Sequence, residues 1–189
     1  CIRDSDMGSL TDQLVAGQIV NVLYPLIEQA RMLVQKYDVV VTNPPYMGSS
    51  GMNARLSDYV KKVYPDSKSD LFAVFIERCA QMDKRGGYQA MITQHAWMFL
   101  SSFEKLRNHI VDAQEISSLV HLGLGTFEDL NSKVVQSVAF VLRNNYTRGY
   151  TGIYDRLFET SGLYEDNAKK ARWLCEGTHR YYAKQDNFS

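Results

Sequence analysis

A short β-branched run that ends at two prolines limits the possible folds of this chain more than any other feature. Residues 38–42, Asp-Val-Val-Val-Thr, are too continuously apolar for a half-exposed strand, and such runs are typical of strands covered on both faces. Asn43-Pro44-Pro45-Tyr46 follows at once, and the prolines, which lack an N–H, end the strand. The run therefore predicts a buried strand whose carboxyl end opens into a rigid turn.

Helical and strand-like patterns alternate along the rest of the chain. Residues 10–36 have helical periodicity, with Pro25 starting a second helix, and a further helix begins at Ser69 or Asp70 and stops at Gly86-Gly87. Ser101 and Glu104 form a capping box that opens the next helix. The remaining strand-like runs are 88–93, 116–122 and 134–142. This alternation predicts an α/β fold with a mostly parallel sheet flanked by helices and the last strand antiparallel at the end of the series.

Two segments depart from that alternation. Residues 47–69 are rich in Gly, Ser and Lys, which predicts a long loop with one or two helical turns. Residues 146–189 are polar and rich in Tyr and Arg, which predicts a boundary near Asn145 and a connector after it.

Composition excludes several classes of protein. The 189 residues are 45% hydrophobic and carry 21 Lys and Arg against 21 Asp and Glu, so no overall basic surface marks a self-sufficient DNA-binding domain. Three cysteines without short spacing argue against disulfides and zinc and fit a reducing cytoplasm, and the four histidines show no i, i+4 pair, so no metal is expected. No apolar run reaches the ~18 residues of a membrane span. The chain starts at Cys1 without a Met, as an excised fragment would.

The Asn43-Pro44-Pro45-Tyr46 tetrad is the main candidate site. In open α/β sheets ligands bind at the carboxyl ends of strands, where this turn is expected. The Asn43 side-chain carbonyl and the Pro44 backbone carbonyl, held by two prolines of fixed φ, could accept both hydrogens of a planar amine, and Tyr46 offers a flat face to a base. The alternative is a rigid turn without function, since Asn, Pro and Tyr are common in turns.

Longer motifs carry a family resemblance. The stretch 37–142 resembles the catalytic half of gamma-class DNA adenine-N6 methyltransferases, which have a Rossmann-like S-adenosylmethionine-dependent fold. Within that class it is similar to the PglX methyltransferases of BREX phage-defence systems, on the strength of the runs 43–49 (Asn-Pro-Pro-Tyr-Met-Gly-Ser), 68–72 (Lys-Ser-Asp-Leu-Phe) and 91–100 (Met-Ile-Thr-Gln-His-Ala-Trp-Met-Phe-Leu).

The resemblance implies a role for each matching residue. Asn43 and Pro44 would accept from the adenine amine, Tyr46 would stack on the flipped base, and Phe127 would pack on it from another side. Asn43 would also border the cofactor, and Phe75 would lie near the cofactor's adenine. Phe75 could equally be a core residue of an amphipathic helix, and Phe127 a surface aromatic.

The chain departs from the family pattern in one respect. The glycine-rich cofactor loop of the class lies upstream of the tetrad, and no Gly-x-Gly turn follows a strand within residues 1–42. Gly123-Leu124-Gly125-Thr126 is a poor substitute because a strand-like run, and no helix, follows it. We therefore expect residues 1–145 to be the catalytic half of a methyltransferase domain and 146–189 to lead toward an absent target-recognition region. The parent would use S-adenosylmethionine, which the fragment would bind poorly or not at all.

Three functions remain open on the sequence. The first is a fragment of a site-specific adenine-N6 methyltransferase that acts on double-stranded DNA with a flipped adenine, in restriction-modification or phage defence, together with defence-system proteins in a bacterial cytoplasm. The second is a protein-glutamine N5 methyltransferase, whose planar amide poses the same chemical problem. The third is a non-catalytic binding module.

Overall fold

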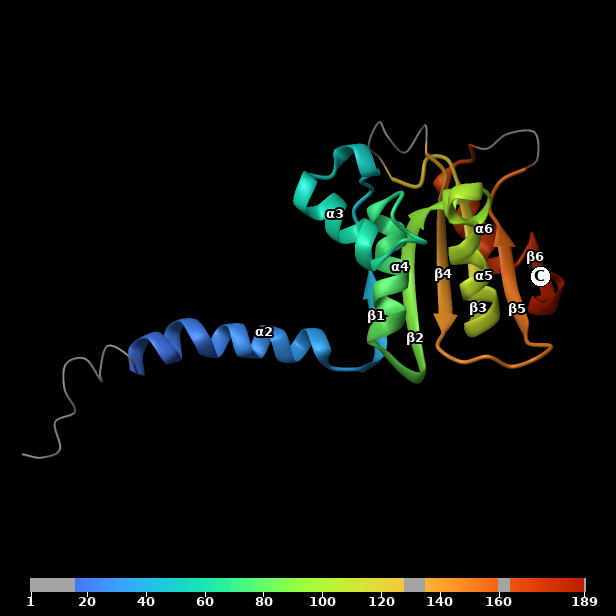
Figure 1. The fold of residues 1–189 in the computed structure, drawn as a ribbon. Coiled ribbons are helices and arrows are strands. Elements are labelled where there is room, and N and C mark those ends of the chain that lie inside the picture. Colours follow the sequence, from blue (N-terminus) through green and yellow to red (C-terminus); the bar gives the residue numbers. More distant parts are fainter. Residues whose placement is uncertain (1–15, 128–134, 160–163, 189) are drawn as a thin grey trace, which may run out of the picture. The chain divides into compact units, whose positions relative to one another are not determined.

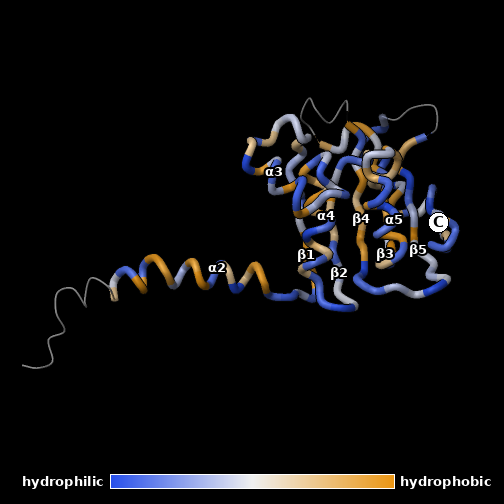
Figure 2. Tube along the Cα trace, viewed as in Figure 1, coloured by the Kyte–Doolittle hydropathy of each residue, from blue (hydrophilic) through white to orange (hydrophobic). Residues whose placement is uncertain are grey.

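The computed structural model describes residues 16–127, 135–159 and 164–188, and the chain divides into two compact units, 1–36 and 37–189. The first unit contains a π-helical turn, Ile19–Leu23, which continues into α2, Tyr24–Val34, with Pro25 in the first turn of α2. Hydrophobic segments recur on successive turns of α2 (Figure 2), and none of the residues in these two elements is buried. The predicted helix is confirmed from residue 16 onward, as is Pro25 in the first turn of α2, whereas residues 10–15 of the prediction lie outside the described residues.

The second unit is built on a six-stranded sheet in the order β1-β2-β4-β3-β5-β6 (Figure 1). β1 pairs with β2, and β3 with β5, in parallel; β4 is antiparallel to β2 and β3, and β6 is antiparallel to β5. The strands span Tyr37–Thr42 (β1), Asp83–Gln94 (β2), Glu115–Gly123 (β3), Ser137–Arg143 (β4), Thr151–Arg156 (β5) and Arg180–Lys184 (β6). The α/β class is confirmed, but the prediction of a mostly parallel sheet is wrong, because two of the five strand pairs among the described residues are parallel and three are antiparallel. The predicted antiparallel strand, β4, does not lie at the end of the series but between β2 and β3, and it pairs with both.

The strand directions define one functional edge of the sheet. β1, β2, β3 and β5 end at this edge, while β4 and β6 start there. We call it the carboxyl edge; it is the upper edge of the sheet in Figure 1. The last residues of β2 and β3, Gln94 and Gly123, pair at this edge with Ser137, the first residue of β4.

Two helices cover one face of the sheet. α4, Leu71–Met82, contacts β1 and β2, and α5, Glu104–Ala113, contacts β3. Their apolar residues join the inward side chains of the central strands in the main core, which includes Phe72, Ile76, Met91, Leu106, Ile110, Val138, Phe140 and Leu142. Burial of these large side chains is the main source of stability for this layer.

The opposite face of β1 differs from the prediction. Val40 packs against the main core, whereas Val39 and Val41 are 56% and 71% exposed. The run of three valines had predicted a strand covered on both faces, and that prediction is wrong for the part of the chain that the structure describes. An unbroken apolar run indicates that both faces can be covered but does not say which segment covers them.

The segment 47–69 is more ordered than a long loop. It contains a short 3₁₀ turn, Ser49–Gly51, and the ten-residue helix α3, Ala54–Val63, whose first turn is capped by Asn53 through a 2.9 Å bond from the Leu56 N–H. The apolar side of α3 packs with Val74 of α4 in a second, smaller core.

Two predicted helix signals act differently from expectation. The 3₁₀ turn Ser101–Phe103 precedes α5, and no side chain caps α5, so the predicted capping box is not formed. α4 ends at Met82, and Gly87 lies inside β2, where an added Cβ would come within 3.0 Å of the Asp38 carbonyl oxygen. Gly87 thus allows β1 and β2 to approach each other closely, and it does not mark the end of α4.

The segment after Asn145 continues the same sheet. β5 pairs with β3, and β6 and α6, Asn167–Glu176, follow within the same compact unit. The 2%-exposed Gln185 accepts from the Ile116 N–H at 2.9 Å and donates to the Val111 carbonyl at 2.7 Å. No separate compact unit begins near Asn145. Among the described residues, no helix has the length and apolar character needed to cross a membrane.

Candidate active site

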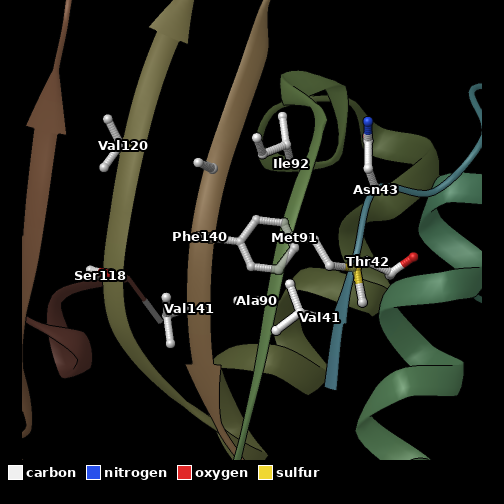
Figure 3. A pocket seen from close by; sticks show the side chains of 11 residues that line it. Val41, Thr42, Asn43, Ala90, Met91, Ile92, Ser118, Val120, Phe140 and Val141 are labelled. Atoms are coloured by element: carbon white, nitrogen blue, oxygen red, sulfur yellow. The ribbon is translucent and has the colours of Figure 1, made fainter. Parts of the chain in front are cut away.

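The Asn43–Tyr46 turn lies at the carboxyl edge, immediately after β1. Thr42 is the last residue of β1 and pairs with Met91 of β2, so Asn43 is the first residue beyond the paired part. Asn43 is exposed and extends past the end of the strand beside Ile92 (Figure 3), whereas Pro44 is buried and Pro45 is exposed. The sequence-based prediction of this position is confirmed.

Tyr46 is held from two sides. Its ring meets the buried Phe72 ring edge-on, with centroids 6.2 Å apart and planes at 80°. Burial raises the pKa of the Tyr46 phenol, and a hydrogen bond with the Ser137 side chain acts in the opposite direction. The side chain remains 37% exposed, so part of the ring is accessible to a ligand.

Asp70 fastens the turn to α4. One of its carboxylate oxygens accepts from the Phe72 N–H at 3.3 Å, which caps the helix, and from the Met47 N–H at 3.1 Å. The Leu71 N–H donates to the Met47 carbonyl at 2.9 Å. The pKa of the Asp70 carboxyl is raised because its burial outweighs these hydrogen bonds. Met47, the residue after Tyr46, is therefore fixed by two hydrogen bonds to the start of α4, one to the Asp70 carboxylate and one from the Leu71 N–H.

Ser137 lies at the carboxyl edge, between the ends of β2 and β3. It is the first residue of β4, is 2% exposed, and pairs with Gln94 of β2 and Gly123 of β3. Phe127 lies four residues after Gly123 and is 36% exposed. Tyr46 and Phe127 thus follow two strands that end at the same edge of the sheet, and their contact with one base stays a prediction.

Phe75 lies one turn into α4. It is half-buried and is not among the fully buried core residues of that helix, which are Phe72, Ala73, Val74, Ile76 and Cys79. Its expected position near a cofactor adenine stays a prediction.

An apolar hollow of about 410 Å³ borders Asn43 on the uncovered face of the sheet. Figure 3 shows its lining side chains on β1, β2, β4 and β3, around Val41, Ile92, Val120 and Val141. Thr42, Asn43 and Ser118 are its polar lining residues. None of its lining residues carries a carboxylate that could bind ribose hydroxyls, so the hollow alone does not fit a complete S-adenosylmethionine site.

A pair of histidines at this edge was not predicted. His95 follows β2 and His121 lies near the end of β3, and their Nδ1 and Nε2 atoms are 3.2 Å apart. Burial, followed by the neighbouring His95, lowers the pKa of His121 to about 4, and burial lowers the pKa of His95. Both residues stand next to predicted strand ends, but 25 residues separate them in sequence. The described residues contain no group of three or more metal-binding side chains.

Comparison with known proteins assigns the chain to a family. The Eco57I restriction-modification methylase family model matches residues 16–127. The adenine-specific methyltransferase BrxX of Escherichia coli O9:H4 (strain HS) is 41% identical over 168 residues, which cover 89% of this chain and 14% of BrxX. The adenine-specific methyltransferase PglX of Lacticaseibacillus casei (strain Zhang) is 42% identical over 195 residues, covering 99% of this chain and 16% of PglX. The chain thus spans about one seventh of these relatives.

A solved structure supports the fold assignment. A Listeria monocytogenes protein described as a class I S-adenosylmethionine-dependent methyltransferase matches with a TM-score of 0.53 at 20% identity, over 76% of this chain and 42% of that protein. At this identity the match shows a shared fold. The family model and the two relatives establish that the chain belongs to the Eco57I restriction-modification methylase family.

Proposed function

We propose that this chain is the part of a longer adenine-specific DNA methyltransferase that holds the target adenine. The observation that carries the proposal is the fixed geometry of the Asn43–Tyr46 turn, with Asn43 exposed at the end of β1 and Tyr46 held by Phe72 and Ser137. Family membership and the adenine-specific relatives support the same function.

The chemistry of an adenine amine explains why such a turn is needed. The amine is a weak nucleophile because its lone pair is delocalised into the ring. We assign the Asn43 side-chain carbonyl and the Pro44 backbone carbonyl as acceptors for its two N–H bonds, which would favour the geometry that frees the lone pair. Positioning and preorganised dipoles then supply most of the rate enhancement. Both acceptors are neutral carbonyl groups, so neither has to gain or lose a proton to accept these hydrogen bonds.

The aromatic residues would hold the base outside the helix. An adenine inside a duplex must be flipped out to reach the turn, and stacking on an aromatic ring stabilises an unstacked base by roughly 1–3 kcal/mol. We assign Tyr46 and Phe127 to this role. Both are partly exposed at the carboxyl edge, which leaves ring surface available.

S-adenosylmethionine would supply the methyl group. The described residues provide Asn43 and an apolar hollow beside it, but no ribose-binding carboxylate lines that hollow. We propose that most of the cofactor's contacts come from parts of the longer protein outside this chain, and that Phe75 borders the cofactor's adenine.

Double-stranded DNA is the proposed partner, although the chain has a formal charge of zero. Contacts between basic side chains and phosphates account for most non-specific affinity for DNA. The main DNA-binding surface would therefore belong to other parts of the protein. Residues 146–189 would lead toward the target-recognition region. The setting would be a bacterial cytoplasm, in phage defence or restriction-modification, with other proteins of the defence system.

The alternatives are less well supported. A protein-glutamine methyltransferase would use the same turn, but the family and both relatives are of the restriction-modification and adenine-specific type. A binding module would need Asn43 only as a surface residue, which makes Asn43→Ala the discriminating variant.

Calorimetric titration with S-adenosylmethionine tests the division of the site between this chain and the rest of the protein. The full-length protein is expected to bind, and the 189-residue chain to bind at least about tenfold more weakly. Equal affinities would place the cofactor site within this chain and contradict the proposal. Methylation assays with full-length protein, on a DNA duplex and on a glutamine-containing protein, test the substrate; methyl transfer to protein alone would overturn the assignment.

A further inference from the structure

The loop that leads from β3 to Phe127 has a defined conformation. Gly123 and Gly125 both adopt φ of +69°, a region that other residues rarely enter. A Cβ added to Gly125 would lie 2.5 Å from the Tyr164 ring, and Leu124 forms an isolated parallel bridge with Tyr164. The Thr126 hydroxyl donates to the Gly123 carbonyl at 3.3 Å. The loop is therefore built against the segment that follows β5.

Lys170 of α6 anchors the same loop. Its side chain is 5% exposed, and Nζ donates to the Leu124 carbonyl at 2.5 Å, between the two left-handed glycines. Lysine normally keeps its ammonium group in water, and burial of the charge is costly. Burial accordingly lowers the pKa of Lys170, although the Glu165 carboxylate acts in the opposite direction. An apolar side chain would fill this position at lower cost, so the position of the ammonium calls for a specific role.

We infer that Lys170 is a positioning residue for Phe127, and that α6 is thereby part of the base-binding site. Through the Leu124 carbonyl, three residues before Phe127, the ammonium fixes the direction in which the chain leaves β3. The inference rests on the proposed function, because it assigns the purpose of this anchor to a ring that stacks on the flipped adenine.

A direct phosphate contact is a less suitable role for this lysine. Its Nζ is directed to a backbone carbonyl within the fold, and the residue is almost fully buried. The neighbouring Lys169 has a 34%-exposed side chain and pairs with Glu165 and Glu159 at 2.9 and 3.5 Å. Lys169 therefore provides a control on the same helix turn, with the same charge and a different set of contacts.

A double-variant experiment in the full-length methyltransferase tests the inference. Lys170→Met should lower kcat/KM for duplex DNA about tenfold, and Phe127→Ala should lower it tenfold or more. Because Lys170 would act through Phe127, adding Lys170→Met to Phe127→Ala should cause little further loss. Lys169→Met should stay within about twofold of the unmodified protein. The Tm of each variant is measured first by thermal unfolding, so that all assays can be run well below it.

Each alternative result has a separate meaning. Multiplied losses in the double variant, or an unchanged Lys170→Met, would overturn the inference while leaving the stacking role of Phe127 in place. Full activity in Phe127→Ala would remove that role and the inference with it, but not the roles of Asn43 and Pro44. If Lys170→Met does not fold, Lys170→Gln, which keeps a shorter N–H donor, should show a severalfold loss that is absent in the Phe127→Ala background. Equal losses in both backgrounds would overturn the inference.

Discussion

His95 and His121 face each other across the start of β4, with ring nitrogens 3.2 Å apart and ring centroids 5.2 Å apart. The Phe158 ring meets His121 edge-on at 4.8 Å, and the nearby Arg156 adds to the effect of burial and of His95 in lowering the His121 pKa. One imidazole can donate to the other only while both are neutral or one is protonated. The carboxyl edge thus contains a pair of bases that the fold keeps largely uncharged near neutral pH.

Acidification should weaken the fold through His121. Its pKa is lowered from 6.5 to about 4 in the folded chain, so between these values the unfolded state binds more protons than the folded state. The free energy of unfolding should therefore fall as the pH is lowered from about 6.5 toward 4. Urea unfolding at several pH values checks this. His121→Phe should flatten the slope, whereas the exposed His109→Phe should keep it; equal slopes in all three proteins would contradict the prediction.

Asn43→Ala should abolish most activity without affecting the fold. In the full-length protein we expect kcat to fall by roughly 100-fold or more, as when one preorganised hydrogen-bonding group is removed from an active site. The free energy of unfolding should change by less than about 0.5 kcal/mol, since Asn43 is exposed. Methylation kinetics and denaturant unfolding measure the two effects. Asn108→Ala, at an exposed position on α5, is the matched control, and equal activities in the two variants would favour a non-catalytic role for the turn.

Asp70→Ala should reduce both stability and activity. Loss of the cap on α4 should cost about 1 kcal/mol of unfolding free energy, and loss of the bond from Met47 should loosen the turn that carries Tyr46. Asn53→Ala removes the cap of α3 at a similar cost and should leave kcat within about twofold. Denaturant unfolding and methylation assays compare the pair. Similar activity losses in both variants would mean that reduced stability alone explains the effect.

Gln185→Ala tests whether the segment after Asn145 belongs to the folded unit. The buried side chain bonds the Ile116 N–H and the Val111 and Gln114 carbonyls, so its removal leaves several buried groups unpaired. We expect a loss of about 2–4 kcal/mol. The exposed Asn187→Ala should cost less than about 0.5 kcal/mol. Thermal and urea unfolding give the values, and a negligible cost for Gln185→Ala would indicate that the segment is a loosely attached connector.

Local chemistry explains which parts of the site the sequence could predict. The end of β1 at Asn43 was predictable because a β-branched run favours a strand and prolines end it. The position of Tyr46 relative to Ser137 was not, because 90 residues separate them and strand pairing brings them together. The same holds for His95 and His121. They follow or belong to β2 and β3, which both pair with β4, and the sequence does not show this pairing.

The missed elements have weak local signals. The α3 helix has alternating polar and apolar residues but follows a run rich in Gly and Ser, so the segment as a whole resembles a loop in the sequence. β5 is short and contains Gly152, which resembles a turn residue in the sequence. In the structure an added Cβ there would clash with the Ile116 carbonyl oxygen, so glycine is needed for the close approach of β5 to β3. A requirement of this kind becomes visible only when both strands are in place.

The register of β4 determines both which of its side chains enter the main core and which side chain contacts Tyr46 at the carboxyl edge. Ser137 and Val138 are consecutive, and their side chains point to opposite faces of the sheet, with Val138 in the main core and Ser137 hydrogen bonded to Tyr46. A slip of one residue would exchange the two faces and bury a hydroxyl where the valine now packs. A single-residue insertion or deletion between Ser137 and the core residues of β4 would therefore separate the position that contacts Tyr46 from its register with the core, whereas a change of two residues would keep the alternation.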